Sequence, residues 1–208
     1  MKKLNAVAEA IRKNNMRAIV VENESQALDA VRSILTKGAT ISSGGSQTLK
    51  ETGIFDLITN GDYNYLDRTT DLEATHKAFS ADYYLLGCNA ITSDGVLYNV
   101  DGFANRISAL TFGPKSVIVV AGKNKIVDTL DDAIYRVKAV AAPLNAKRLN
   151  CDTYCAKNGK CVSLNKSHPV MTDGCSSPAR ICCSYAVTAQ QRQKDRITVI
   201  LINRELGL

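Results

Sequence analysis

Short apolar runs alternate with segments of helical periodicity along most of this chain, and this alternation constrains the fold more than any other feature. Residues 116–120 are almost entirely Val and Ile, which is typical of a central parallel strand covered on both faces. Strands that alternate with helices indicate a mostly parallel sheet flanked by helices. We therefore expect an α/β fold, with strands over residues 16–21, 39–42, 81–86, 90–92, 96–100, 116–120 and 196–202 and helices over 2–15, 24–35, 47–51, 72–79, 105–110 and 128–141.

Capping and turn residues fit this division of the chain. Asn23 stands where the N-cap of a helix belongs, Gly53 is placed to end a helix, and Pro143 is expected to end the helix over residues 128–141. Asp94-Gly95 lies between two short apolar pieces, which is a strong hairpin signal.

Length and charge narrow the class of protein. A chain of 208 residues with 45% hydrophobic residues suits a single domain, residues 1–208, with a Cys-rich insertion over 151–183 before the last strand. No apolar run approaches the roughly 20 residues of a membrane span, and no signal-peptide pattern is present, so we expect a cytoplasmic protein without membrane contact. The net charge of +6 comes from dispersed Lys and Arg, without Trp or a basic-aromatic motif. This pattern argues against nucleic acid and fits a small anionic ligand or a solvated surface.

A dense group of short polar residues follows the strand predicted over 81–86. Polar loops beyond a strand end are where α/β proteins bind small molecules. Asp94 and Asp101 are the candidates for acid–base catalysis, although each precedes a glycine and also suits a turn. The candidate ligand-binding residues of this group are Asn89, Asn99, Asn105 and Arg106.

Two further loops follow predicted strands and could contact an anion. Gly44, Gly45 and Ser46 form a turn that opens a helix, where backbone N–H groups can approach a phosphate or carboxylate. The alternative is a tight turn with a capping serine. Lys123 and Lys125 follow the Val/Ile strand, and either could neutralise an anion or lie in a solvated loop.

Six of the seven cysteines fall after residue 150. In a cytosolic chain such clustering favours metal or redox chemistry over structural disulfides. Thiolates select zinc or an iron–sulfur cluster, and Cys155, Cys161, Cys175 and Cys182 are the candidate ligands. Free thiols and native disulfides remain alternatives, because no Cys-x-x-Cys pair is present. With only two histidines, a Ser–His or Cys–His mechanism is poorly supported.

These motifs together resemble the LUD (lactate-utilisation) domain family, in particular its LutC/YkgG group. The resemblance rests on the segment from Gly44 to Gly53, the window from Asn89 to Arg106, and Phe112-Gly113-Pro114-Lys115. It continues through the lysine loop and the Cys-rich tail. It implies a fold of the NagB/RpiA/CoA-transferase type and a role in oxidation of L-lactate to pyruvate, beside iron–sulfur oxidoreductase subunits.

A more distant likeness concerns the initiation-factor-2B-like sugar-phosphate isomerases, in which an Asp acts as acid or base in a similar strand and loop. Asn89 occupies that position here, and an amide cannot transfer the proton. The sequence thus leaves two functions open. One is a subunit or accessory factor of lactate oxidation that binds a small anionic ligand, and the other is a non-catalytic ligand-binding or redox-sensing module. Turnover stays undecided, and an oligomer is compatible with both.

Overall fold

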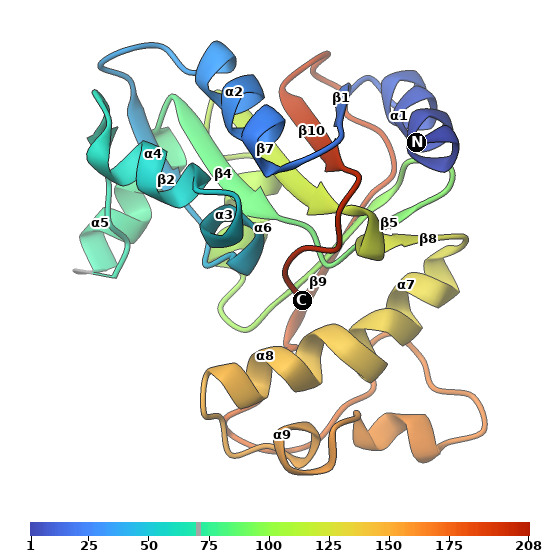
Figure 1. The fold of residues 1–208 in the computed structure, drawn as a ribbon. Coiled ribbons are helices and arrows are strands. Elements are labelled where there is room, and N and C mark those ends of the chain that lie inside the picture. Colours follow the sequence, from blue (N-terminus) through green and yellow to red (C-terminus); the bar gives the residue numbers. More distant parts are fainter. Residues whose placement is uncertain (70–71) are drawn as a thin grey trace.

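A six-stranded sheet forms the centre of the molecule in the computed structural model, which describes residues 1–69 and 72–208 (Figure 1). Its paired strands all run parallel, in the order β1-β10-β7-β4-β2-β3, which confirms the expected mostly parallel sheet. The strands are β1 (Arg17–Val21), β2 (Thr40–Ser43), β3 (Asn64–Tyr65), β4 (Tyr83–Gly87), β7 (Ser116–Gly122) and β10 (Ile197–Ile202).

Helices cover both faces of this sheet. Val117 and Val119 of β7 pack on one face with α1 (Lys2–Lys13) and α6 (Asn105–Thr111). Ile118 and Val120 point to the other face, where α2 (Glu24–Ile34), α3 (Gln47–Glu51) and α4 (Ile54–Asn60) lie. Because β7 is buried on both faces, its sequence reads as a continuous apolar run rather than an alternating one.

A second sheet, which contains both parallel and antiparallel strand pairs, lies between the main sheet and residues 130–183. Its order, over the described residues, is β8-β5-β6-β9. Strands β5 (Ala90–Thr92) and β6 (Leu97–Asp101) form the predicted hairpin, and Gly95 has the positive φ of +83° that its turn requires. Strand β8 (Ile126–Val127) pairs with β5, and β9 (Ser184–Thr188) pairs with β6.

The small lobe, residues 130–183, packs against this second sheet at the bottom of Figure 1. It consists of α7 (Leu130–Arg136), a π-helical turn η3 (Val137–Ala141), α8 (Ala142–Arg148), α9 (Tyr154–Asn158), and the 3₁₀ turn η4 (Val162–Asn165). The expected end of the helix at Pro143 is wrong. The backbone stays helical from α7 into α8, because the π turn precedes the proline and Pro143 occupies the first turn of α8, where its missing N–H costs little.

Two capping residues predicted from the sequence take those roles in the structure. Asn23 caps α2 through the Gln26 N–H (3.0 Å), and Gly53 adopts a left-handed conformation after α3, as predicted. Within the described residues, no helix is long and apolar enough to cross a membrane. The other elements are α5 (Leu72–Lys77), η1 (Ala78–Ser80) and η2 (Lys123–Lys125).

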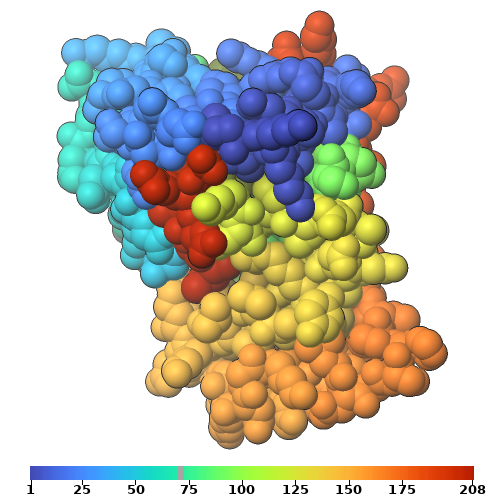
Figure 2. Space-filling model, turned by 45° about the vertical axis from the view of Figure 1, so that its right-hand side comes forward, coloured from blue at the N-terminus to red at the C-terminus, as the bar shows by residue number. Residues whose placement is uncertain are grey.

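The last residues of the chain lie on the surface between the two parts of the molecule. Figure 2 shows this red segment between the cyan region of α3 and α4 and the gold helices of the small lobe. Contacts hold it there: Leu206 N–H donates to Asn124 Oδ1 (3.1 Å) and Gly207 N–H donates to Glu51 Oε2 (2.7 Å). The segment therefore closes one side of the space between the sheet and the small lobe.

Candidate functional site

A cleft of about 650 Å³ separates the main sheet from the small lobe. Its upper wall is built by residues at the carboxyl ends of strands, including Gly44 after β2, Gly87 at the end of β4 and Asp101 at the end of β6. Its lower wall includes Asn145 and Arg148 of α8, and Cys183 lines the cleft beside Asp101. Open parallel sheets bind ligands at the carboxyl ends of their strands, so this cleft is the candidate functional site.

The upper wall is held together by the side chain of Arg106. Nε donates to Asp101 Oδ1 (2.8 Å), Nη1 donates to the Gly87 carbonyl oxygen (2.9 Å) and Asn99 Oδ1 (3.1 Å), and Nη2 donates to Asn89 Oδ1 (2.8 Å) and the Val100 carbonyl oxygen (2.9 Å). These bonds use all five N–H groups of a guanidinium. Arg106 therefore fixes the ends of β4 and β6 relative to one another, and its donors are already engaged.

Two of its partners, Asp101 and Asn89, accept further hydrogen bonds. Asp101 is 7% exposed, and its second carboxylate oxygen accepts the backbone N–H of Ile107 in the first turn of α6 (2.8 Å). Asn89 Oδ1 also accepts the Val100 N–H (2.9 Å). Asn99 is fully buried, and its Nδ2 has no hydrogen-bond partner among the described residues. Arg106 and these three side chains thus form a fixed hydrogen-bond network that shapes the cleft.

Glycines allow side chains to cross the turn between β2 and α3. A Cβ on Gly44 would lie 2.8 Å from Arg106 Cδ, and one on Gly45 would lie 2.9 Å from Arg68 Nη2. Ser46 caps α3 by accepting the Leu49 N–H (3.3 Å). This is the capping role that the sequence allows for Ser46, and the residue also lines the cleft.

Lys125 supplies a positive charge inside the cleft. It is 4% exposed, and Nζ donates to Thr48 Oγ1 (3.0 Å). The ion pairs found among the described residues do not include it. Burial lowers the pKa of its ammonium group to about 8. A buried cation that lacks a carboxylate at salt-bridge distance is an electrostatic site for an anion.

The structure brings most of the predicted ligand-binding residues together. Three predicted residues lie outside the cleft lining: Asp94, Asn99 and Lys123. Asp94 is exposed in the β5–β6 turn and accepts a hydrogen bond from the Thr92 hydroxyl. Lys123 is exposed at the start of η2. The predicted residues that line the cleft are Gly44, Gly45, Ser46, Asn89, Asp101, Asn105, Arg106 and Lys125.

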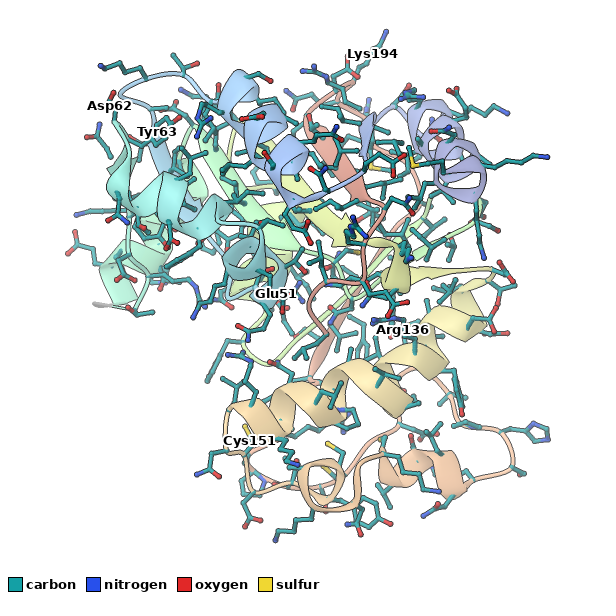
Figure 3. All side chains as sticks on the ribbon, viewed as in Figure 1. Glu51, Asp62, Tyr63, Arg136, Cys151 and Lys194 are labelled. Carbon is teal, nitrogen blue, oxygen red and sulfur yellow. The ribbon has the colours of Figure 1, made fainter. Side chains whose placement is uncertain are left out.

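Several lining residues were not predicted from the sequence as ligand-binding residues. Arg68 follows β3 and donates from Nε to the Ser43 carbonyl oxygen (3.0 Å), which places it beside the glycine turn. Arg148 reaches the cleft from the end of α8, and its guanidinium bonds Asn145 Oδ1. Cys151 and Cys183 add two thiols to the cleft lining, and Figure 3 shows Cys151 at one end of the small lobe, between α8 and α9. Neither arginine lies in a local motif, and the two cysteines belong to the Cys-rich segment without being among its four predicted metal ligands.

The thiol of Cys88 also borders the cleft but is 1% exposed. It donates to the Ala90 carbonyl oxygen (2.9 Å), and burial raises its pKa. These features describe a protonated core thiol.

Sequence comparison assigns the chain to a family. The model of the LUD domain matches residues 4–202. The chain belongs to the LUD domain family. This family is associated with lactate utilisation. No curated protein matches this LUD domain at a significant level.

A solved structure is similar to this LUD domain over nearly the whole length of both chains. It is the crystal structure of a DUF162 family protein from Deinococcus radiodurans, with a TM-score of 0.55 and 15% sequence identity. The match covers 97% of this chain and 96% of the other. At this identity the similarity supports the α/β fold and carries no information about the ligand.

Proposed function

We propose that this LUD domain binds a small anion, carrying a phosphate or carboxylate group, in the cleft between the sheet and the small lobe. The buried ammonium group of Lys125 is the observation that carries this proposal. Its charge is held at the carboxyl edge of a parallel sheet, next to Ser46, in a cleft that Arg68 also lines. An anion there would restore the charge balance that burial otherwise makes unfavourable.

Within the family, this ligand site fits a LutC-like protein that serves as a subunit or accessory factor in the oxidation of L-lactate to pyruvate. Lactate and pyruvate are both small carboxylates, which matches the charge of the cleft. Iron–sulfur oxidoreductase subunits are the proposed partners. The arrangement supports binding more directly than proton transfer, because both carboxylate oxygens of Asp101 already accept hydrogen bonds.

A thermal-shift screen tests the binding proposal. Lactate, pyruvate, inorganic phosphate, sugar phosphates, coenzyme A and nucleotides are added separately to the purified protein. A ligand that binds the native state alone raises the melting temperature. We expect at least one of these anions to do so in the wild-type protein and not in Lys125→Met. Lys123→Met is the matched control, because this neighbouring lysine is exposed and lies outside the cleft. No shift with any of the anions would contradict the proposal.

A redox-sensing module is the second candidate function. The observation that favours it is the pair of thiols, Cys151 and Cys183, in the wall of the same cleft. Oxidation of either thiol by peroxide would add a polar group beside the bound anion. If this function applies, peroxide treatment changes the ligand-induced thermal shift of the wild-type protein and leaves that of the Cys151→Ser/Cys183→Ser double variant unchanged.

A further inference from the structure

Four cysteines of the small lobe line one cavity that is separate from the anion cleft. Cys155 comes from α9, Cys161 from the residue before η4, and Cys175 and Cys182 from the loops that precede β9. We call these four residues the thiol pocket. They are the same four that the sequence indicates as metal ligands, and all four are free thiols in the structure. The other two tail cysteines, Cys151 and Cys183, open to the cleft instead.

The segment that carries the thiol pocket has little apolar core of its own. Over residues 151–183, only Met171 and Cys182 join a hydrophobic cluster, and both lie at its margin. The buried residues of this segment, as far as the structure describes it, are Thr153, Cys155, Cys161 and Ser163. A segment of this size without a core usually needs a disulfide or a metal to stabilise it.

The charge beside the thiol pocket is positive. Lys138 of η3 lines the same cavity and is 6% exposed. Its Nζ donates to Ser163 Oγ (3.1 Å) and to the Asp173 carbonyl oxygen (2.5 Å), and Ser163 Oγ lies 3.2 Å from Cys161 Sγ. The Asp173 carboxylate pairs with Lys166 instead. A buried ammonium group is therefore placed to stabilise negative charge on the sulfurs.

We propose that the thiol pocket binds a single soft divalent cation, Zn²⁺, through the thiolates of Cys155, Cys161, Cys175 and Cys182. Each thiol loses its proton on binding, so four protons are released and the resulting centre carries a charge of about −2, opposite Lys138. The cavity of about 20 Å³ has room for one atom-sized occupant. This size favours a lone ion over an iron–sulfur cluster.

Binding requires the thiols to move closer together. In the part of the chain that the structure describes, no three His, Cys, Asp or Glu side chains are arranged as a finished metal site. Rotation about Cα–Cβ bonds moves the sulfurs between staggered positions without moving the backbone. The proposal is independent of the anion cleft, because the two cavities share none of their lining cysteines.

Zinc binding and thiol protection test the site. The full-length reduced protein is stripped with a chelator, titrated with Zn²⁺ alone, and alkylated with a thiol reagent before mass spectrometry. We expect about one zinc ion per chain, protection of the four thiol-pocket cysteines, and continued alkylation of Cys151 and Cys183. Unfolding temperature should rise with zinc. This experiment needs no variant, so a folding defect cannot obscure it.

Variants then separate the two sets of cysteines. Cys161→Ser and Cys175→Ser should each lose the zinc-dependent rise in melting temperature, whereas Cys151→Ser and Cys183→Ser should retain it. The proposal is overturned if Zn²⁺ protects none of the four thiols, if anaerobically purified protein contains iron and sulfide at cluster stoichiometry, or if mass spectrometry finds native disulfides among them. Loss of zinc binding would leave the anion-dependent thermal shift intact, so the two proposals fail separately.

Discussion

Arg106 determines the shape of the cleft through the geometry of one side chain. Its planar guanidinium reaches two carbonyl oxygens, two asparagine side chains and one carboxylate at the same time. An ammonium group has three donors on one atom and cannot span these acceptors. The sequence indicates a polar site here, but it cannot show that Asn89 and Asp101 accept hydrogen bonds from Arg106 and are therefore already occupied.

Replacement of this arginine tests its positioning role. Arg106→Lys keeps the charge but leaves several buried acceptors without a donor, so we expect a loss of about 2–3 kcal/mol in unfolding free energy. Urea denaturation measures the change. Arg32→Lys is the control, because Arg32 pairs with Asp29 on the exposed surface and should change stability by less than about 0.5 kcal/mol. Equal effects of the two substitutions would contradict this role.

The lowered pKa of Lys125 predicts a dependence of stability on pH. Its folded-state pKa of about 8 lies below the ordinary value of 10.5. Between these values the unfolded chain binds more protons, so this residue makes the protein more stable as pH rises from 8 to 10.5. Lys125→Met should therefore stabilise the ligand-free protein at pH 7, by an amount on the order of 3 kcal/mol, and by less at pH 10. Urea denaturation of both proteins at the two pH values measures the difference, and a constant difference would contradict the assignment.

At the level of elements, the turn between β2 and α3 depends on two glycines that have different neighbours. A Cβ on Gly44 would meet Arg106 Cδ, which is held in place, whereas a Cβ on Gly45 would meet the end of the Arg68 side chain. Gly44→Ala should destabilise the protein by about 1–3 kcal/mol. Gly45→Ala should change stability by less than about 1 kcal/mol, because a side-chain end can move, and should weaken anion binding by displacing Arg68.

Thermal denaturation with and without the anion separates these two effects. The interpretation is wrong if Gly44→Ala leaves stability unchanged or if Gly45→Ala is the more destabilising of the two.

Elements with strong periodicity are predictable from this sequence, and those that depend on tertiary contacts are not. The apolar run of β7 and the Asp94-Gly95 turn can be recognised from the local sequence alone. Strand β9 cannot be recognised in this way, because its residues are half-exposed and its strand conformation depends on pairing with β6. Continuation of the helix through Pro143 depends on the π turn that precedes it, which no local propensity indicates.

At the level of the whole molecule, the cleft depends on how the small lobe is attached. Arg136 of α7 donates to the carbonyl oxygens of Asn89 (2.6 Å) and Asn124 (3.0 Å), both in the upper part of the molecule. Figure 3 shows this arginine at the junction of the two parts. The sequence predicted the loops that form the upper wall, but Arg68, Arg148, Cys151 and Cys183 join them only through long-range packing. Their roles could not be predicted without the fold.

Loss of this junction should affect binding and stability together. Arg136→Met leaves two carbonyl oxygens without their donor, and we expect a loss of about 2 kcal/mol in unfolding free energy. The anion-dependent thermal shift should fall as well, because the lower wall of the cleft is no longer held. Retention of both wild-type stability and ligand response in Arg136→Met would contradict this description of the cleft.

Calorimetric titration of an anion at two pH values tests the central claim, that Lys125 makes this cleft an anion site. Pyruvate and sulfate serve as probes, because their charge stays constant between pH 7 and 9.5. Cys88, Arg136, Arg106 and Glu51 are the other ionisable groups that act on Lys125. Affinity should fall by roughly tenfold for each pH unit above 8. Lys123→Met should behave as wild type, and Lys125→Met should bind neither anion at any pH. Binding of equal affinity by Lys125→Met and the wild-type protein would contradict the claim.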